Sequence, residues 1–93
     1  MSATRLRPPV ITEAQILKNR YDEARQIKDA WDWRLRRAQH ELRDATVNGT
    51  GDRHAAARNA AAVEIQVADA AGELRVALNA WMQATLTHER KTA

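Results

Sequence analysis

A mirror relation about Gly49 limits what this chain can fold into more than any other feature of its sequence. Each core-type position before this glycine has a core-type position at the same distance after it, so that Leu35 meets Val63 and Trp31 meets Val67. Large side chains on one side of the mirror mostly meet small ones on the other, which is how two long helices pack side by side. The sequence therefore predicts an all-α fold in which two long antiparallel helices form a coiled-coil hairpin.

Both halves of the chain carry apolar residues at the a and d positions of a heptad repeat, and we call these positions the seam. Lys28 alone breaks the apolar pattern. Its long side chain either carries the ammonium group past the seam or fixes the register of the two helices at some cost in stability. The seam consists of Ala14, Leu17, Tyr21, Ala24, Lys28, Trp31, Leu35, Ala38, Leu42 and Ala45 in the first half and of Ala56, Ala60, Val63, Val67, Ala70, Leu74, Ala77, Trp81 and Ala84 in the second.

Local signals set the ends of the two helices. Thr12 and Gln15 have the spacing of a capping box, and Ile11 and Ile16 have that of a hydrophobic staple. Asn and Gly residues between the halves accept the left-handed conformation that ends a helix, and Asp52 is the expected N-cap of the second helix. The predicted parts are an extended, basic and proline-containing tail (1–11), a hairpin domain (12–90) with helices at about 13–46 and 53–88 joined by a loop (47–52), and a C-terminal tail (91–93).

Composition narrows the class of protein. The 93 residues allow one domain, and the absence of cysteine excludes disulfides and thiolate metal sites. No apolar run approaches the roughly 20 residues that span a bilayer, and the basic N-terminal stretch leads into no signal-peptide core. We therefore expect a protein of the cytoplasm or of a phage particle, without a standard secretion signal. The abundance of arginine and alanine is typical of GC-rich bacterial or phage genomes.

A second apolar stripe follows the second helix beside the seam and is interrupted by Glu64 and Arg75. A hairpin satisfied by its own two helices has no need of this face, so we expect another helix to cover it. A second copy would give a two-fold symmetric four-helix bundle, and a different helical partner would serve equally well. Gly72 is either a tolerated loss of helix propensity or a place where a neighbouring backbone comes close. The residues expected to mediate self-association are Ala57, Ala61, Ala68, Ala71, Leu78 and Met82, which form the second stripe, with Ile16 and Ile27 as a weaker counterpart in the first helix.

No group of residues has the spacing of a catalytic or cofactor site. His40 and Asp44 are four residues apart, as two ligands on one helix would be, but two ligands are too few for a zinc site. The Gly49-Thr50-Gly51 stretch follows a helix rather than a strand and lacks the lysine of a phosphate-binding loop. We therefore expect no enzymatic activity, cofactor, metal ion or small-molecule substrate. Membrane-surface binding is not expected either, because the polar face of the first helix has nearly as many acidic as basic residues.

An aromatic and basic surface is predicted on the outer side of the first helix, opposite the seam. Three interpretations remain open. Tryptophan and arginine are common anchors of protein interfaces, arginine and an aromatic ring can hold phosphate and base of a nucleic acid, or the tryptophan simply lies against its own helix with Arg37 stacked on it. We call this set the Trp33 surface, and it consists of Trp33, Arg34, Arg36, Arg37, His40 and Arg43.

These patterns predict a non-enzymatic helical hairpin that works through protein–protein contact. It would be a structural, adaptor or inhibitor component of a bacterial or phage assembly, with the second stripe as its self-association surface and the Trp33 surface as its partner-binding site. The alternative is a nucleic-acid-binding helical bundle that uses the arginines of paired hairpins. Nearby acidic residues weaken the positive field of the Trp33 surface, which places nucleic acid second.

Overall fold

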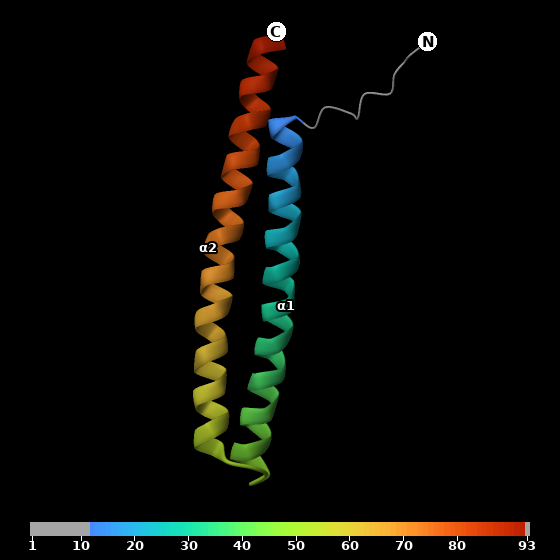
Figure 1. The fold of residues 1–93 in the computed structure, drawn as a ribbon. Coiled ribbons are helices and arrows are strands. Elements are labelled where there is room, and N and C mark those ends of the chain that lie inside the picture. Colours follow the sequence, from blue (N-terminus) through green and yellow to red (C-terminus); the bar gives the residue numbers. More distant parts are fainter. Residues whose placement is uncertain (1–11, 93) are drawn as a thin grey trace, which may run out of the picture.

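The computed structural model of the chain describes residues 12–92, without the side chains of His88, Lys91 and Thr92. Two helices, α1 (Glu13–Val47) and α2 (Arg53–Thr92), run antiparallel and side by side to form an elongated hairpin (Figure 1). The described residues form no strand. The predicted all-α helical hairpin is therefore confirmed, whereas the predicted tail 1–11 lies outside the described residues.

One half of the predicted capping box forms at the start of α1. The Thr12 hydroxyl oxygen accepts a hydrogen bond from the backbone N–H of Gln15 at 3.1 Å. The Gln15 side chain does not complete the box, because its amide nitrogen donates to the Asn19 side-chain oxygen at 3.2 Å. The other predicted signal is the staple between Ile11 and Ile16, of which Ile11 lies outside the described residues.

Two glycines make the turn between the helices. α1 ends at Val47, one residue later than predicted, and Asn48 stays in the right-handed region with φ −100° while its N–H donates to the Asp44 carbonyl oxygen at 2.9 Å. Gly49 and Gly51 then adopt positive φ angles of 65° and 76°. The left-handed conformation predicted for the loop therefore belongs to the glycines and not to the asparagine, since only glycine adopts it without steric cost.

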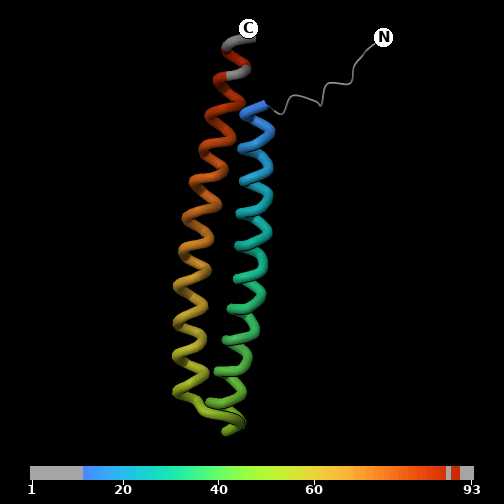
Figure 2. The backbone as a smooth tube through the Cα atoms, viewed as in Figure 1, coloured from blue at the N-terminus to red at the C-terminus, as the bar shows by residue number. Residues whose placement is uncertain are grey.

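The start of α2 follows the prediction, and its end does not. An Asp52 carboxylate oxygen accepts hydrogen bonds from the backbone N–H groups of His54 (2.9 Å) and Ala55 (3.2 Å), which makes Asp52 the N-cap. α2 continues to Thr92, beyond the expected end near His88, because no glycine or proline follows to stop it. Figure 2 shows both helices as continuous coils, with α2 extending past the N-terminal end of α1.

The seam lies between the two helices as predicted, because each of its positions is buried or half-buried. The rings of Tyr21 and Trp81 meet across it, with their centroids 5.4 Å apart. Among the described residues no large side chain is fully buried, so the core is only one layer of side chains deep. The buried positions are all alanines, namely Ala38, Ala45, Ala60 and Ala70.

Lys28, the one charged residue of the seam, forms an ion pair at the edge of the seam. Its ammonium nitrogen lies 2.7 Å from a carboxylate oxygen of Asp32, one helical turn further along α1. Both side chains are partly covered, with 24% of Lys28 and 34% of Asp32 exposed. The apolar stem of the lysine thus stays at the seam while its charge reaches the edge, which agrees with the first of the two predicted roles.

Candidate interaction surfaces

The antiparallel pairing gives the hairpin two broad faces, one on each side of the seam. In an antiparallel pair of helices the e positions of one helix flank the e positions of the other, and the g positions likewise flank g positions. We call these the e face and the g face of the hairpin. The b positions continue the e face outward, and the c positions continue the g face, so each predicted site residue can be assigned to one face.

The second stripe of α2 occupies e and b positions and lies uncovered on the e face. Ala71 and Leu78, which flank the seam, are half-buried by α1, whereas the remaining stripe residues are exposed. Met82 is 51% exposed although it is a large apolar side chain. Glu64 and Arg75 interrupt the stripe and have no ion-pair partner within residues 12–92. Within residues 12–92, therefore, α1 covers only the edge of the stripe and no other helix covers the rest.

The two isoleucines expected to support the stripe lie elsewhere. Ile16 and Ile27 are 43% and 49% exposed, at c and g positions of α1. Both positions belong to the g face, on the opposite side of the seam from the second stripe. The geometry therefore separates the stripe from the counterpart that the sequence pattern attached to it, since helical spacing alone does not tell on which side of a partner helix a residue lies.

Several exposed apolar side chains were not identified from the sequence. Ile65 (61% exposed) and Leu86 (46% exposed) occupy f positions of α2 and widen the second stripe at its outer edge. Val76 (69% exposed) lies at the next position around the helix, and Val47 (72% exposed) ends α1. Assigning a heptad letter to every residue of α2, rather than to the seam and its nearest flank, would have revealed the first three.

The centre of the Trp33 surface is a stacked pair of side chains. The guanidinium carbon of Arg37 lies 5.6 Å from the centroid of the Trp33 ring, and 55% of Trp33 remains exposed. Arg37 also lies 3.5 Å from a carboxylate oxygen of Glu41. The predicted stacking of Arg37 on Trp33 is therefore present, and it presents a large aromatic surface to solvent in a defined orientation.

Two other members of the Trp33 surface are engaged with their own helix. The guanidinium of Arg34 lies 4.5 Å from the ring centroid of Trp31, the seam tryptophan. The imidazole Nε2 of His40 lies 3.3 Å from a carboxylate oxygen of Asp44, so the two residues with the spacing of metal ligands contact each other. Both basic groups are therefore less available to a partner molecule, because each already contacts a side chain one turn away on its own helix.

The remaining two arginines face a different direction. Arg36 and Arg43 occupy b positions, on the e face, and have no ion-pair partner within residues 12–92. Arg34 and Arg37 occupy g and c positions, on the g face. The Trp33 surface is therefore not one patch: Trp33 and His40 lie at its outer ridge, and the arginines divide between its two slopes.

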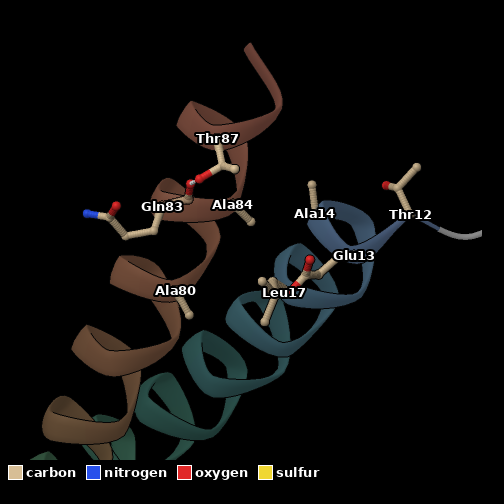
Figure 3. A pocket seen from close by; sticks show the side chains of 8 residues that line it. All are labelled: Thr12, Glu13, Ala14, Leu17, Ala80, Gln83, Ala84 and Thr87. Carbon is tan, nitrogen blue, oxygen red and sulfur yellow. Dashed lines mark hydrogen bonds between the residues drawn. The ribbon is translucent and has the colours of Figure 1, made fainter. Parts of the chain in front are cut away.

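Shallow hollows occur on the g face of the hairpin. One of about 360 Å³ lies beside the Trp33 ring and is lined by Arg37 of α1 and Asn59 of α2, among others. A wider notch of about 610 Å³ lies at the open end of the hairpin, where Ala80 and Ala84 point toward α1 (Figure 3). The lining residues of this notch are Thr12, Glu13, Ala14, Leu17, Ala80, Gln83, Ala84 and Thr87.

Metal-ligating clusters and membrane-spanning helices are two further features that can be judged for the described residues. Within residues 12–92 no three His, Cys, Asp or Glu side chains gather closely enough to hold a metal ion. In the same part of the chain, neither helix combines the length and the apolar character needed to cross a membrane.

Compared with protein-family models, with curated proteins and with solved structures, the chain gives no match.

Proposed function

We propose that this protein is a helical-hairpin interaction module that acts by protein–protein contact, as a structural, adaptor or inhibitor component of a bacterial or phage assembly. It acts without catalysis and has two separate surfaces. The second stripe mediates self-association into a four-helix bundle, and Trp33 on the outer ridge, together with Arg37 stacked on it from the g face, binds a protein partner with acidic groups. We call this pair the Trp33 ridge.

The observation that carries this proposal is the mismatch between what the hairpin buries and what it exposes. Among the described residues only alanines are buried, while Trp33, Ile65 and Met82 each keep half or more of their surface exposed. A small single-layer core stabilises a chain weakly, and large exposed apolar patches mark sites where another molecule packs. A protein partner supplies what the hairpin lacks.

The Trp33 ridge has the composition of an interface anchor. Tryptophan and arginine are enriched among residues that dominate binding energies, and Arg37 holds the Trp33 ring in one orientation before a partner arrives. An anchor that is already ordered loses less conformational entropy on binding. The adjacent hollow beside Asn59 offers space for a side chain of the partner.

A comparison of Trp33→Ala with Gln26→Ala tests the partner-binding surface. Gln26 shares the f position of α1 one heptad earlier, is exposed and has no flanking arginine cluster, so it is a matched control. Each immobilised variant is exposed to a lysate of the native host, and the retained proteins are quantified by mass spectrometry against the unmodified chain. A partner retained by the unmodified chain and by Gln26→Ala but lost at least tenfold in Trp33→Ala supports the proposal.

The opposite result would reject the Trp33 ridge as the binding site. If the same proteins are retained equally by both variants, Trp33 only covers its own helix. Sedimentation across a range of concentrations tests the second surface independently, because a folded monomer at every concentration would remove self-association from the proposal.

A nucleic-acid-binding bundle is the second candidate, and Arg36 and Arg43 favour it. These two arginines lie on one slope of α1 without an ion-pair partner among residues 12–92, which leaves their charges available to phosphates. Filter binding at low salt decides: retention of DNA or RNA that falls steeply with added salt would support this candidate. Absence of retention would remove it.

A further inference from the structure

We propose that a second copy of this chain packs on the second stripe with α2 antiparallel to α2, about a two-fold axis that passes between Asp69 and Ala70. This inference specifies the self-association in the proposed function and rests on it. It is independent of the Trp33 ridge, which lies on the far side of α1. The residues of α2 indicate that a second α2 covers the stripe, that it runs antiparallel, and which residues of the two copies face each other.

The apolar members of the stripe are complementary to themselves about this point. Residues at equal distances on either side of the Asp69–Ala70 bond face each other in an antiparallel pair. Ala61 then meets Leu78 of the second copy, and Ala57 meets Met82. A two-fold axis repeats each contact with the roles exchanged, so a large side chain meets a small one at both ends of the interface.

The charged members of the stripe are complementary in the same register. Glu64 and Arg75 are also equidistant from the Asp69–Ala70 bond, so each Glu64 meets Arg75 of the other copy, twice per dimer. Within residues 12–92 neither side chain has an ion-pair partner of its own. The two residues that seemed to interrupt the stripe become its register markers, because opposite charges at an interface fix orientation more than they add affinity.

Other arrangements of two α2 helices lose this match. A slip of one heptad in either direction places Arg75 opposite Ala57 or Ala71, and it places Glu64 opposite an apolar residue. A parallel arrangement in register places Glu64 on Glu64 and Arg75 on Arg75, which is repulsive. Antiparallel pairing about the Asp69–Ala70 bond is the register in which both charges are paired and every apolar stripe residue meets another.

Small residues at the centre of the stripe fit the same axis. Ala68 meets Ala71 of the second copy, where the two helices come closest. A Cβ added to Gly72 would meet no heavy atom within 4 Å other than the neighbouring backbone of α2 itself, so the space over this glycine is open. Ile65 lies at the same outer edge of the stripe, is 61% exposed, and falls beside Gly72 of the second copy. The mid-helix glycine thus has a role between two copies that it lacks within one.

α1 leaves this approach free. The e and b positions lie about a quarter turn around α2 from the seam, given 3.6 residues per turn. Because α1 runs along one side of α2 only (Figure 1), a second α2 can lie against the neighbouring side. The corresponding b and e positions of α1 carry mainly charged and polar residues, so α2 supplies the apolar contact.

Charge exchange at the two register markers tests the proposal. Glu64→Arg alone and Arg75→Glu alone each place like charges at both contacts, and we expect self-association to weaken at least tenfold in sedimentation equilibrium. An equimolar mixture of the two variants restores opposite charges at both contacts, so it should form a heterodimer. The double variant, carrying both changes, should again form a homodimer. Asp69→Arg is the matched control, because Asp69 is an exposed acidic residue of α2 outside the stripe.

The pattern of results separates the proposal from its rivals. Single variants that lose helix by circular dichroism remain informative, because the mixture should then regain it. A mixture that stays dissociated while each single variant is dissociated would overturn the antiparallel register. Self-association unaffected by any exchange would overturn the stripe as the interface, and a wild-type monomer at all concentrations would overturn the second copy as occupant. Trp33→Ala should leave sedimentation unchanged, so failure at the partner-binding ridge is a separate outcome.

Discussion

The two helices share one seam but differ in their outer surfaces. α1 turns charged and polar side chains outward, and within residues 12–92 it forms i,i+4 ion pairs such as Lys18–Asp22 and Arg37–Glu41. α2 carries apolar residues around much of its circumference, with Ile65 and Val76 exposed by 61% and 69%. The exposed apolar side chains of α1 are separated by charged residues, whereas Ile65, Met82 and Leu86 of α2 belong to or adjoin the second stripe. α2 therefore has the more continuous apolar surface, which is typical of a helix that another helix covers.

This difference indicates which apolar side chains stabilise the single hairpin and which remain available for contact with another molecule. The seam needs only a narrow stripe from each helix, and outside it α1 exposes Trp33 and a few isolated aliphatic side chains. Most of the additional large apolar side chains of α2 stay exposed in the hairpin, so under the proposed self-association their stabilising contribution would come from the assembly. Mutations on the two outer surfaces should accordingly change different properties.

The largest expected effect compares the inner and outer tryptophans of α1. Trp31→Ala removes a seam side chain and should lower the free energy of unfolding by about 3 kcal/mol. Trp33→Ala removes an exposed ring and one cation–π contact, so the loss should stay below about 1 kcal/mol. Urea denaturation at one fixed protein concentration measures both. Equal losses would mean that the assignment of inner and outer faces on α1 is wrong.

A smaller effect compares the seam with the outer surface of α2. Leu35→Ala should cost about 2 kcal/mol, at the low end of the range for such changes because Leu35 is only half-buried. Val76→Ala, on the exposed side of α2, should change the unfolding free energy by no more than about 0.5 kcal/mol. Thermal unfolding monitored by circular dichroism gives both values, and a cost for Val76→Ala that matches Leu35→Ala would indicate a covered outer surface even there.

The smallest effect concerns charge at the seam of α1. Lys28→Leu should stabilise the hairpin by up to about 1 kcal/mol, since leucine fills the seam and the partly exposed Asp32 can turn to water. Lys18→Leu is the matched control, because the Lys18–Asp22 pair has the same spacing outside the seam. Chemical denaturation measures the difference. A loss of stability in Lys28→Leu alone would show that the Lys28–Asp32 pair contributes more than the apolar contact that replaces it.

The sequence was sufficient for the fold because burial and heptad spacing agree at every seam position from Ala14 to Ala84. The mirror relation about Gly49 predicted which residues face each other across the seam, and the N-cap residue Asp52 predicted the start of α2. The end of α2 was predicted too early, because no helix-breaking residue follows His88. Basic residues near the end of a helix do not by themselves terminate it. Helix boundaries depend on small differences in local free energy, which makes them harder to predict than the seam.

The interaction surfaces were only partly predictable. Spacing identified Trp33 and the stripe, but it could not tell that Ile16 lies on the g face, because that requires knowing on which side of each helix its partner runs. It also could not tell that Arg34 would stack on Trp31 rather than join Arg36. Such choices depend on side-chain rotamers, which heptad positions do not specify.

The mirror register has a consequence for how the chain acquires its shape. Pairs next to the glycine turn, such as Leu42 with Ala56, join residues that are close in sequence, whereas Ala14 and Ala84 join residues near opposite ends. Forming the outer pairs first would close a long loop at once, while forming them last adds only a short extension to a closed structure. The order with the lowest loop-closure entropy therefore starts with the pairs next to Gly49 and proceeds toward the open end of the hairpin. The same open end is where the two helices can separate most readily.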